Sequence, residues 1–217
     1  MTSRAQILAA ARRIIDQEGW EKLTIRRLAA EVGVGATTLY HHVRDKQDLL
    51  VQLLDDHTAR IERPDLPDEP RDRIVAAATA MHDALVAWPW AAEVLTVDGL
   101  VGLLGEPALW IVEAIVAGAQ DHGCTPDQAV DVFRNIWYFT VGETLVRSHS
   151  ATRRPAEVER PTEFFAGLDA TRLPRLAAIG DRWPALAARD TYPRALRVLV
   201  DGLLAQAAST TDADPVR

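Results

Sequence analysis

Apolar residues recur every three or four positions along nearly the whole chain, and this spacing is typical of amphipathic α-helices. No stretch shows the apolar–polar alternation of a strand, so the pattern predicts an all-α fold. Near the start of the chain it predicts a helix over 3–18, which Gly19 ends. The apolar stripe of that helix comprises Ile7, Ala11, Ile14 and Ile15.

Three more helices are expected directly after the first. Thr24 suits the start of a short helix that stops near Gly33, and a third helix is predicted over 35–42. Asp45 caps a fourth, whose apolar side carries leucines. Two short helices joined by a tight glycine turn are the elements of a helix-turn-helix. The pattern therefore predicts a three-helix domain over 1–47, followed by a connecting helix over 48–63.

The segment RPDLPDEP (63–70) contains three prolines and marks a boundary. Proline has no backbone N–H to donate, so this segment is a linker and not a helix interior. Beyond it we expect a larger helical domain over 71–208 and a disordered tail over 209–217. Its helices are predicted near 71–87, 90–97, 106–122, 126–148, 172–189 and 191–208, with a polar loop over 148–161.

The third helix has an apolar side and a polar side. At 100° per residue, Leu39 and Val43 lie on the inward side of this helix. There we expect them to pack against Leu28 of the second helix and Leu49 of the fourth. The outward side is polar and uncharged, and Arg26, Arg27 and Lys46 place positive charge around it. Hydrogen-bonding side chains of this kind suit the base edges of a major groove and the phosphates beside it. The outward set is Thr37, Thr38 and His41, flanked by Tyr40 and His42.

Of three other interpretations of this face, one stays open on spacing alone and two are disfavoured. The face is equally consistent with the solvated surface of a small helical domain. A metal site is disfavoured because His41 and His42 are adjacent and diverge by about 100°, whereas chelation on one helix needs i, i+4 spacing. A catalytic site would need a cleft and a partner acid or base, and a surface helix offers neither.

The net charge of −7 is unevenly distributed. Residues 1–47 hold eight basic against five acidic residues, while 48–217 hold sixteen against twenty-six. Only the N-terminal part is therefore suited to approach nucleic acid. The lone Cys124 excludes an internal disulfide, and no apolar run approaches the roughly 20 residues of a membrane span. We expect a cytoplasmic protein without a signal peptide, membrane contact, metal or cofactor.

The run LTIRRLAAEVGVGATTLYHHVRDKQDLL (23–50) resembles the N-terminal domain of the TetR family of bacterial transcriptional regulators. The matching features are the T-x-R-x-LA frame, the G-V turn, the T-L-Y-x-H-V core and the K-x-x-LL start of the next helix. The stretch FTVGETL (139–145) is similar to the tetracycline-repressor-like subgroup. The resemblance implies a ligand-responsive regulator, most often a repressor, whose C-terminal domain over 71–208 binds an effector and dimerises.

The resemblance also implies partners and site residues. A homodimer would form through helices near 126–148 and 191–208 and bind a roughly palindromic double-stranded operator. By motif, the implied DNA contacts are Arg26, Thr37, Thr38, Tyr40, His41 and His42, with Lys46 as a phosphate contact. The subgroup holds drug-bound magnesium through a histidine, a threonine and a glutamate. The matching positions here are Leu95, Asp98 and Val146, so magnesium–tetracycline is not the expected effector.

Aromatic residues after the linker suggest where a small molecule binds. Phe133 and Trp137 share one side of a helix, and we expect them to line an effector pocket with Met81, His82 and Trp110. Such walls favour a largely apolar or aromatic ligand. The alternative is that these side chains only fill the core, which is the commoner role of aromatic residues at helical spacing.

Other functional classes have weaker support in the sequence. No nucleophile–base motif, phosphate-binding loop or HExxH is present, so an enzyme is not expected. Cys124 precedes Thr125 and Pro126 at a helix start, where a thiol pKa can fall, and a redox sensor would use this. An activator of the same family and a purely helical interaction module remain as further alternatives.

Overall fold

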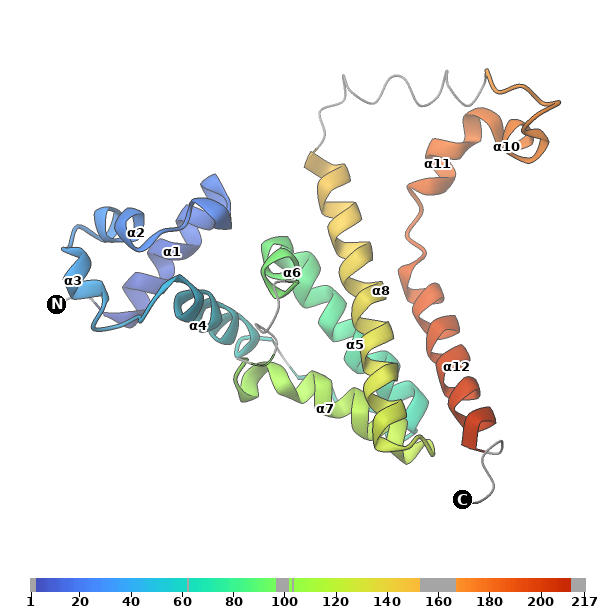
Figure 1. Ribbon diagram of the computed structural model, residues 1–217, viewed down its shortest axis with the longest axis horizontal. Coiled ribbons are helices and arrows are strands. Elements are labelled where there is room, and N and C mark those ends of the chain that lie inside the picture. The colour runs from blue at the N-terminus through green and yellow to red at the C-terminus, as the bar shows by residue number, and fades with distance from the viewer. Residues whose placement is uncertain (1–2, 62, 97–101, 103, 153–166, 212–217) are drawn as a thin grey trace.

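The computed structural model describes residues 3–61, 63–96, 102, 104–152 and 167–211. In these residues every regular element is a helix, which confirms the all-α fold class. Figure 1 shows a small N-terminal group of short helices beside a larger group of long ones. None of the described helices is both long and apolar enough to cross a membrane.

The N-terminal domain is built from four short elements whose ends follow the predicted signals. Thr24 accepts a hydrogen bond from the backbone N–H of Arg27, and Gly33 adopts the left-handed conformation with φ of 75°. Gly19, at φ of 90°, ends the first helix by donating its N–H to Ile15. The elements are α1 (Arg4–Glu18), η1 (Trp20–Lys22), α2 (Ile25–Val32) and α3 (Ala36–Leu39).

The predicted inward side of the helix-turn-helix forms its core. Leu28 and Leu39 are fully buried, and Val43 is nearly so. Ala29 is small enough to let α2 and α3 meet, and its carbonyl accepts the N–H of Val34 at 3.0 Å. Each buried leucine contributes roughly 1.5–3 kcal/mol. Because these contacts lie on one side, they fix which side of α3 faces solvent.

The third helix is shorter than the predicted 35–42. Regular α-helix ends at Leu39, and the chain continues through tight turns in which His42 donates its N–H to the Leu39 carbonyl at 2.8 Å. These tighter i to i+3 bonds begin where the chain must turn toward α4 (Lys46–Thr58). The Asp45 side chain caps α4 by accepting from the N–H of Asp48 at 2.8 Å, as predicted.

The C-terminal domain packs four long helices and one short one. Helix α5 lies against α7 and α8, and α12 runs beside α8 and α5 (Figure 1). Close packing of α5 on α7 depends on Gly118, where an added Cβ would lie 2.7 Å from Ile74. The elements are α5 (Pro70–Ala87), α6 (Pro89–Leu95), α7 (Glu106–Asp121), α8 (Pro126–Thr152) and α12 (Tyr192–Thr211).

The single helix predicted over 172–189 is wrong. The chain forms three short pieces because Gly180, with φ of 56°, breaks the helical path. They are α10 (Pro174–Ile179), η4 (Gly180–Arg182) and α11 (Trp183–Ala187), and none has a buried residue. Figure 1 shows this segment extending away from the helix bundle.

Two predicted irregular segments overlap with helix ends. Helix α8 continues to Thr152, so the first residues of the predicted loop over 148–161 are helical, and 153–161 lie outside the described residues. Likewise α12 continues to Thr211, inside the predicted tail over 209–217. Residues 212–217 lie outside the described residues.

Candidate nucleic-acid interface

The outward side of α3 and the turn after it form an exposed polar surface. Thr37, Thr38 and His41 are exposed, as the helical angles predict. Tyr40 is 57% exposed, so its ring is not part of the core. These four side chains, with the exposed Arg26 of α2, are here named the recognition face. Hydroxyl and imidazole groups on a protruding turn can reach base edges and phosphates without unfolding the domain.

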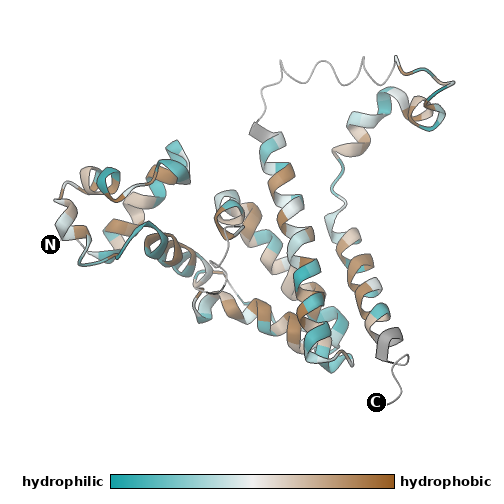
Figure 2. Cartoon of the chain, viewed as in Figure 1, coloured by the Kyte–Doolittle hydropathy of each residue, from teal (hydrophilic) through white to brown (hydrophobic). Residues whose placement is uncertain are grey.

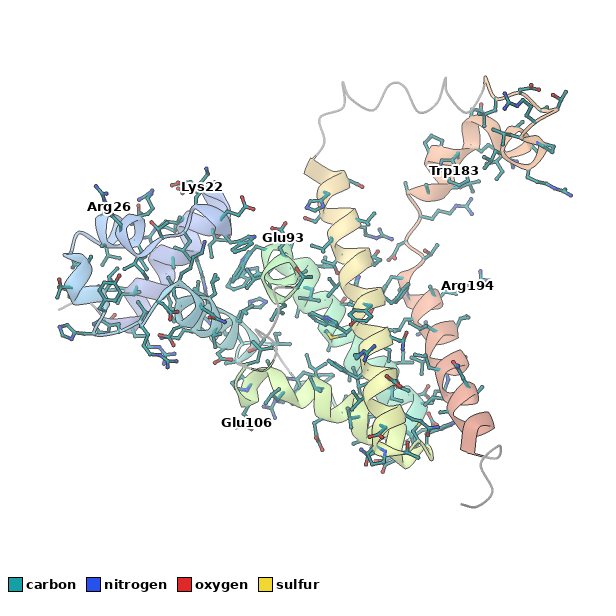
Figure 3. All side chains as sticks on the ribbon, viewed as in Figure 1. Lys22, Arg26, Glu93, Glu106, Trp183 and Arg194 are labelled. Carbon is teal, nitrogen blue, oxygen red and sulfur yellow. The ribbon has the colours of Figure 1, made fainter. Side chains whose placement is uncertain are left out.

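The two arginines at the start of α2 have different environments. The Arg27 guanidinium pairs with Glu18 at 2.7 Å and Glu31 at 3.0 Å, and these carboxylates raise its pKa. Arg27 therefore braces α1 against α2. Arg26 has no ion-pair partner within the described part of the chain and keeps its charge available at the surface. Figure 3 labels Arg26 at the edge of the domain.

Lys46 and His42 lie differently from the other predicted contacts, because both are only half-exposed. The Lys46 Nζ donates to the Glu21 carbonyl at 3.2 Å and lies 5.0 Å from the centroid of the Trp20 ring. Partial burial lowers the pKa of Lys46. The His42 carbonyl accepts from Gln52 of α4. The structure thus does not bring Lys46 onto the recognition face.

Arg44 is a basic residue beside the recognition face that sequence reasoning missed. Its side chain is 87% exposed, between the end of α3 and the start of α4. Its backbone N–H donates to Asp48 at 2.8 Å, which orients the turn. The sequence feature that could have identified Arg44 is its position in the VRDK stretch, directly before the capping residue Asp45. A basic side chain there adds phosphate-binding capacity.

Polar and aromatic contacts join the N-terminal domain to the C-terminal domain. The Trp20 indole donates to Glu93 of α6 at 2.7 Å. Farther along the junction, the Arg12 guanidinium lies over Trp88 and pairs with Asp56. The His57 ring stacks on Trp88 with a centroid separation of 3.8 Å. Figure 3 labels Lys22 and Glu93 on the two sides of this junction.

The five predicted effector residues come from three helices that pack on one another, α5, α7 and α8. Met81 is buried, while Trp110, Phe133 and Trp137 are half-buried and pack against the core. The Trp110 indole nitrogen is buried without a hydrogen-bond partner. His82 belongs to a polar network, bonding Glu143 at 3.1 Å and stacking on Tyr192.

An open cavity of about 920 Å³ lies on the other side of α5. Its α5 wall is made of small residues at helical spacing, such as Ala76, Ala80 and Ala84, and its opposite wall comes from the end of α4 and the linker. None of the five predicted effector residues lines it. The i, i+4 run of alanines was the sequence signal that could have located it. Its other lining residues are His57, Ile61, Pro64, Pro67, Asp72, Val75, Thr79, Asp83, Ala87 and Arg197.

Cys124 does not have the environment of a reactive thiolate. It is 9% exposed, and burial raises its pKa, whereas a helix start was expected to lower it. A thiol is a weak nucleophile until it ionises. The positions that match the magnesium site of the subgroup also differ from a metal site: Leu95 is buried apolar and Val146 is 67% exposed, and Asp98 lies outside the described residues.

Comparison with known proteins gives this arrangement a family. The profile of bacterial regulatory proteins of the tetR family matches residues 7–53, and that of the tetracyclin repressor-like C-terminal domain matches residues 63–207. An exposed reading helix on a helix-turn-helix, attached to a helical body, defines a DNA-binding transcriptional regulator. The chain belongs to the TetR family.

Two relatives and one solved structure illustrate the similarity. The tetracycline repressor protein class A from transposon 1721 of Escherichia coli is 28% identical over 91% of this chain and 88% of its own length. The HTH-type transcriptional repressor DrrR1 of Streptomyces coeruleorubidus is 30% identical over 86% of this chain and 69% of its own length. The structure of the TetR family protein ActR of Streptomyces coelicolor with actinorhodin has a TM-score of 0.77 at 23% identity, covering 95% and 99%. At that identity the last comparison shows the fold.

Proposed function

We propose that this regulator binds a roughly palindromic operator through the recognition face and that a small molecule releases it. The observation that carries this is the exposure of Thr37, Thr38, Tyr40 and His41 above a fully buried Leu39. Arg26 supplies an exposed positive charge beside them, and His42 is half-exposed at the edge. Lys46 contacts phosphate once its amine leaves the Glu21 carbonyl.

The protein acts as a homodimer through α8 and α12. The outward side of α8 carries large apolar side chains at the surface, including Tyr138 at 61% and Val146 at 67% exposure, and α12 carries Val198 at 65%. Figure 2 shows hydrophobic positions along both helices. A second copy that covers this surface places two recognition faces on one side of the DNA, about one helical turn apart.

The effector binds in the cavity between α4, α5 and α12. A volume of about 920 Å³ accommodates a drug-sized molecule. Alanines, prolines and Val75 provide apolar walls, and His57, Asp83 and Arg197 provide polar groups at the edges. This favours a flat, largely apolar or aromatic ligand with polar edges. Because His57 and Ile61 belong to the connecting helix or its end, occupancy bears directly on the segment that carries the DNA-binding domain.

A matched pair of variants separates this cavity from the predicted inner pocket. Ala76→Phe fills the cavity, whereas Trp137→Ala removes an α8 side chain that packs against the core and does not line the cavity. In a thermal-shift screen of aromatic compounds, we expect Ala76→Phe to abolish stabilisation and Trp137→Ala to retain it. The reverse result would place the effector among Met81, His82, Trp110, Phe133 and Trp137. Stabilisation by small charged metabolites alone would contradict the apolar class of ligand.

The remaining parts of the proposal concern catalysis, location in the cell and the direction of regulation. The named relatives are transcriptional regulators, and we assign no catalytic activity to this chain. The protein works in the cytoplasm, where it meets the chromosome. Repression is favoured over activation because both named relatives are repressors. A redox role for Cys124 is disfavoured by the raised pKa of its thiol.

Binding to the duplex immediately upstream of the chain's own gene tests the proposal. We expect a specific complex whose affinity falls steeply as salt rises, because each phosphate contact releases counterions. A random duplex of the same length and composition is the control. Equal affinity for both duplexes would remove the proposed operator recognition.

A further inference from the structure

The carboxylate of Glu93, in α6, makes two contacts at the junction between the domains. Glu93 accepts the Trp20 indole N–H on one oxygen at 2.7 Å. Its other oxygen lies 3.5 Å from His149 Nε2, near the end of α8. The Trp20–Glu93 contact is partly buried, whereas the His149 side chain is 67% exposed and that of Glu93 is 35% exposed. Glu93 therefore connects a helix of the C-terminal domain to the ring of an N-terminal tryptophan.

The same tryptophan ring lies beneath Lys46, which was the expected phosphate contact. The Lys46 amine is 5.0 Å from the ring centroid and donates to the carbonyl of the next residue, Glu21, at 3.2 Å. A cation over an indole face is attracted by the ring quadrupole. The carbonyl and the ring fix where the amine lies, so it reaches a phosphate farther away only by leaving this position.

We infer that Trp20 and Glu93 form a latch that holds the Lys46 amine away from DNA, so that the position of α6 controls one phosphate contact. Trp20 and Glu93 are positioning residues and touch no DNA themselves. The latch rests on the proposed function, because it needs Lys46 to bind phosphate in the complex. It adds a regulatory path from α8 through α6 to the start of α4, made of three side-chain contacts.

Release of the latch strengthens operator binding. Without the carboxylate at position 93 the indole loses its hydrogen-bond acceptor, and Lys46 is held less firmly. We expect Glu93→Ala to raise operator affinity about three- to tenfold, the range for one hydrogen bond's contribution to an equilibrium. The salt dependence should also steepen, by roughly 0.9 in the logarithmic slope for one added phosphate contact. Glu93→Gln keeps an oxygen acceptor for the indole and should bind close to wild type.

Lys46 itself decides whether the gain comes from the latch. In a Lys46→Met background, Glu93→Ala should no longer raise affinity. Glu113→Ala is the matched control, since it removes one exposed carboxylate from α7 of the C-terminal domain and should leave operator affinity unchanged. Unchanged affinity in Glu93→Ala, or an equal gain with and without Lys46, would overturn the latch.

A second measurement needs no DNA-binding result. Lys22 and Lys46 are the two lysines of the sequence, so reductive ¹³C-dimethylation gives two assignable lysine signals by NMR. In the free protein the Lys46 signal should be shifted upfield by the Trp20 ring, and the exposed Lys22 serves as reference. Glu93→Ala should move the Lys46 signal toward that of Lys22, whereas Glu93→Gln should not. A Lys46 signal that is unshifted in wild type, or unaffected by Glu93→Ala, would rule the latch out.

These outcomes distinguish the latch from the proposed function. If wild type shows no operator preference, the proposed function fails whatever Lys46 does. If wild type binds its operator and Lys46→Met weakens binding, while Glu93→Ala changes neither affinity nor the Lys46 signal, the proposed function stands and the latch fails.

Discussion

The N-terminal domain covers its apolar side chains, whereas the C-terminal domain leaves many at the surface. Among the described residues, Tyr40 is the one large exposed apolar or aromatic side chain before α5. The others, all from α5 onward, are Val86, Leu109, Val130, Tyr138, Val146, Leu173, Trp183, Leu186 and Val198. A monomer completes the DNA-binding domain but not the body. The difference supports the proposal that a second copy covers part of the apolar surface of the C-terminal domain.

The largest expected effect comes from removing a buried leucine of the N-terminal domain. Leu39→Ala leaves a cavity under the recognition face and should cost roughly 2–5 kcal/mol of that domain's free energy of unfolding. Leu173→Ala, at a position 44% exposed, is the matched change in the body and should cost less than about 0.5 kcal/mol. Urea unfolding followed by circular dichroism measures both. Similar costs would mean that Leu173 is covered in the assembled protein, which would sharpen the comparison.

A charge on the outward side of α8 should break the dimer while the DNA-binding domain stays folded. Val146→Asp would bury a carboxylate from each protomer in the interface, at a cost of at least about 2 kcal/mol per group. Sedimentation velocity should show monomers at concentrations where wild type is dimeric. Leu109→Asp, on an exposed position of α7, is the control and should remain dimeric. A dimeric Val146→Asp variant would place the interface elsewhere.

Loss of the exposed Tyr40 side chain should weaken DNA binding without loss of stability. Tyr40→Ala is expected to weaken operator binding by about 1–3 kcal/mol, or about 5- to 150-fold, the range for a base contact. The midpoint of thermal unfolding should be nearly unchanged, because the ring is 57% exposed. Gel-shift titration with a thermal melt of the same sample measures both. A large drop in the melting temperature would instead assign Tyr40 to the core.

The smallest effect concerns pH at the domain junction. Burial, the largest cause, lowers the pKa of His57, which also stacks on Trp88. The folded state therefore favours neutral His57. As pH falls below the unfolded value of about 6.5, the unfolded chain gains a proton first and the free energy of unfolding decreases. His57→Phe keeps a ring on Trp88, and its free energy of unfolding should fall less steeply between about pH 6.5 and 5 than that of wild type. Urea unfolding at a series of pH values measures both. Identical slopes in both proteins would remove this role of His57.

The sequence predicted the DNA-binding domain well because its determinants are local. Thr24, Gly33 and Asp45 act within three or four residues of themselves, so a short stretch specifies each helix end. The burial of Leu39 and the exposure of Thr37 then follow from helical angles. The exception is Lys46, whose amine is held by Trp20 and Glu21, more than twenty residues away. No local pattern indicates such a contact.

The cavity that we propose as the effector site was not predicted from the sequence, because its determinants are not local. The cavity is assembled from α4, the linker, α5 and α12, so its lining depends on how distant helices pack. The sequence prediction relied on aromatic residues such as Phe133 and Trp137, whereas none of the residues that line this cavity is a Phe, Tyr or Trp. The break at Gly180 was also missed, because glycine is tolerated inside many helices and its φ of 56° becomes known only from the backbone.

The most direct test of the central claim compares an operator with both half-sites against a duplex with one. The claim is that each chain carries a complete recognition face and that α8 and α12 join two of them. The account predicts about 100- to 10,000-fold tighter binding to the full site, as expected when a second contact becomes intramolecular. It also predicts that Val146→Asp loses this advantage and keeps the half-site affinity. Equal affinity of wild type for both duplexes would contradict the account.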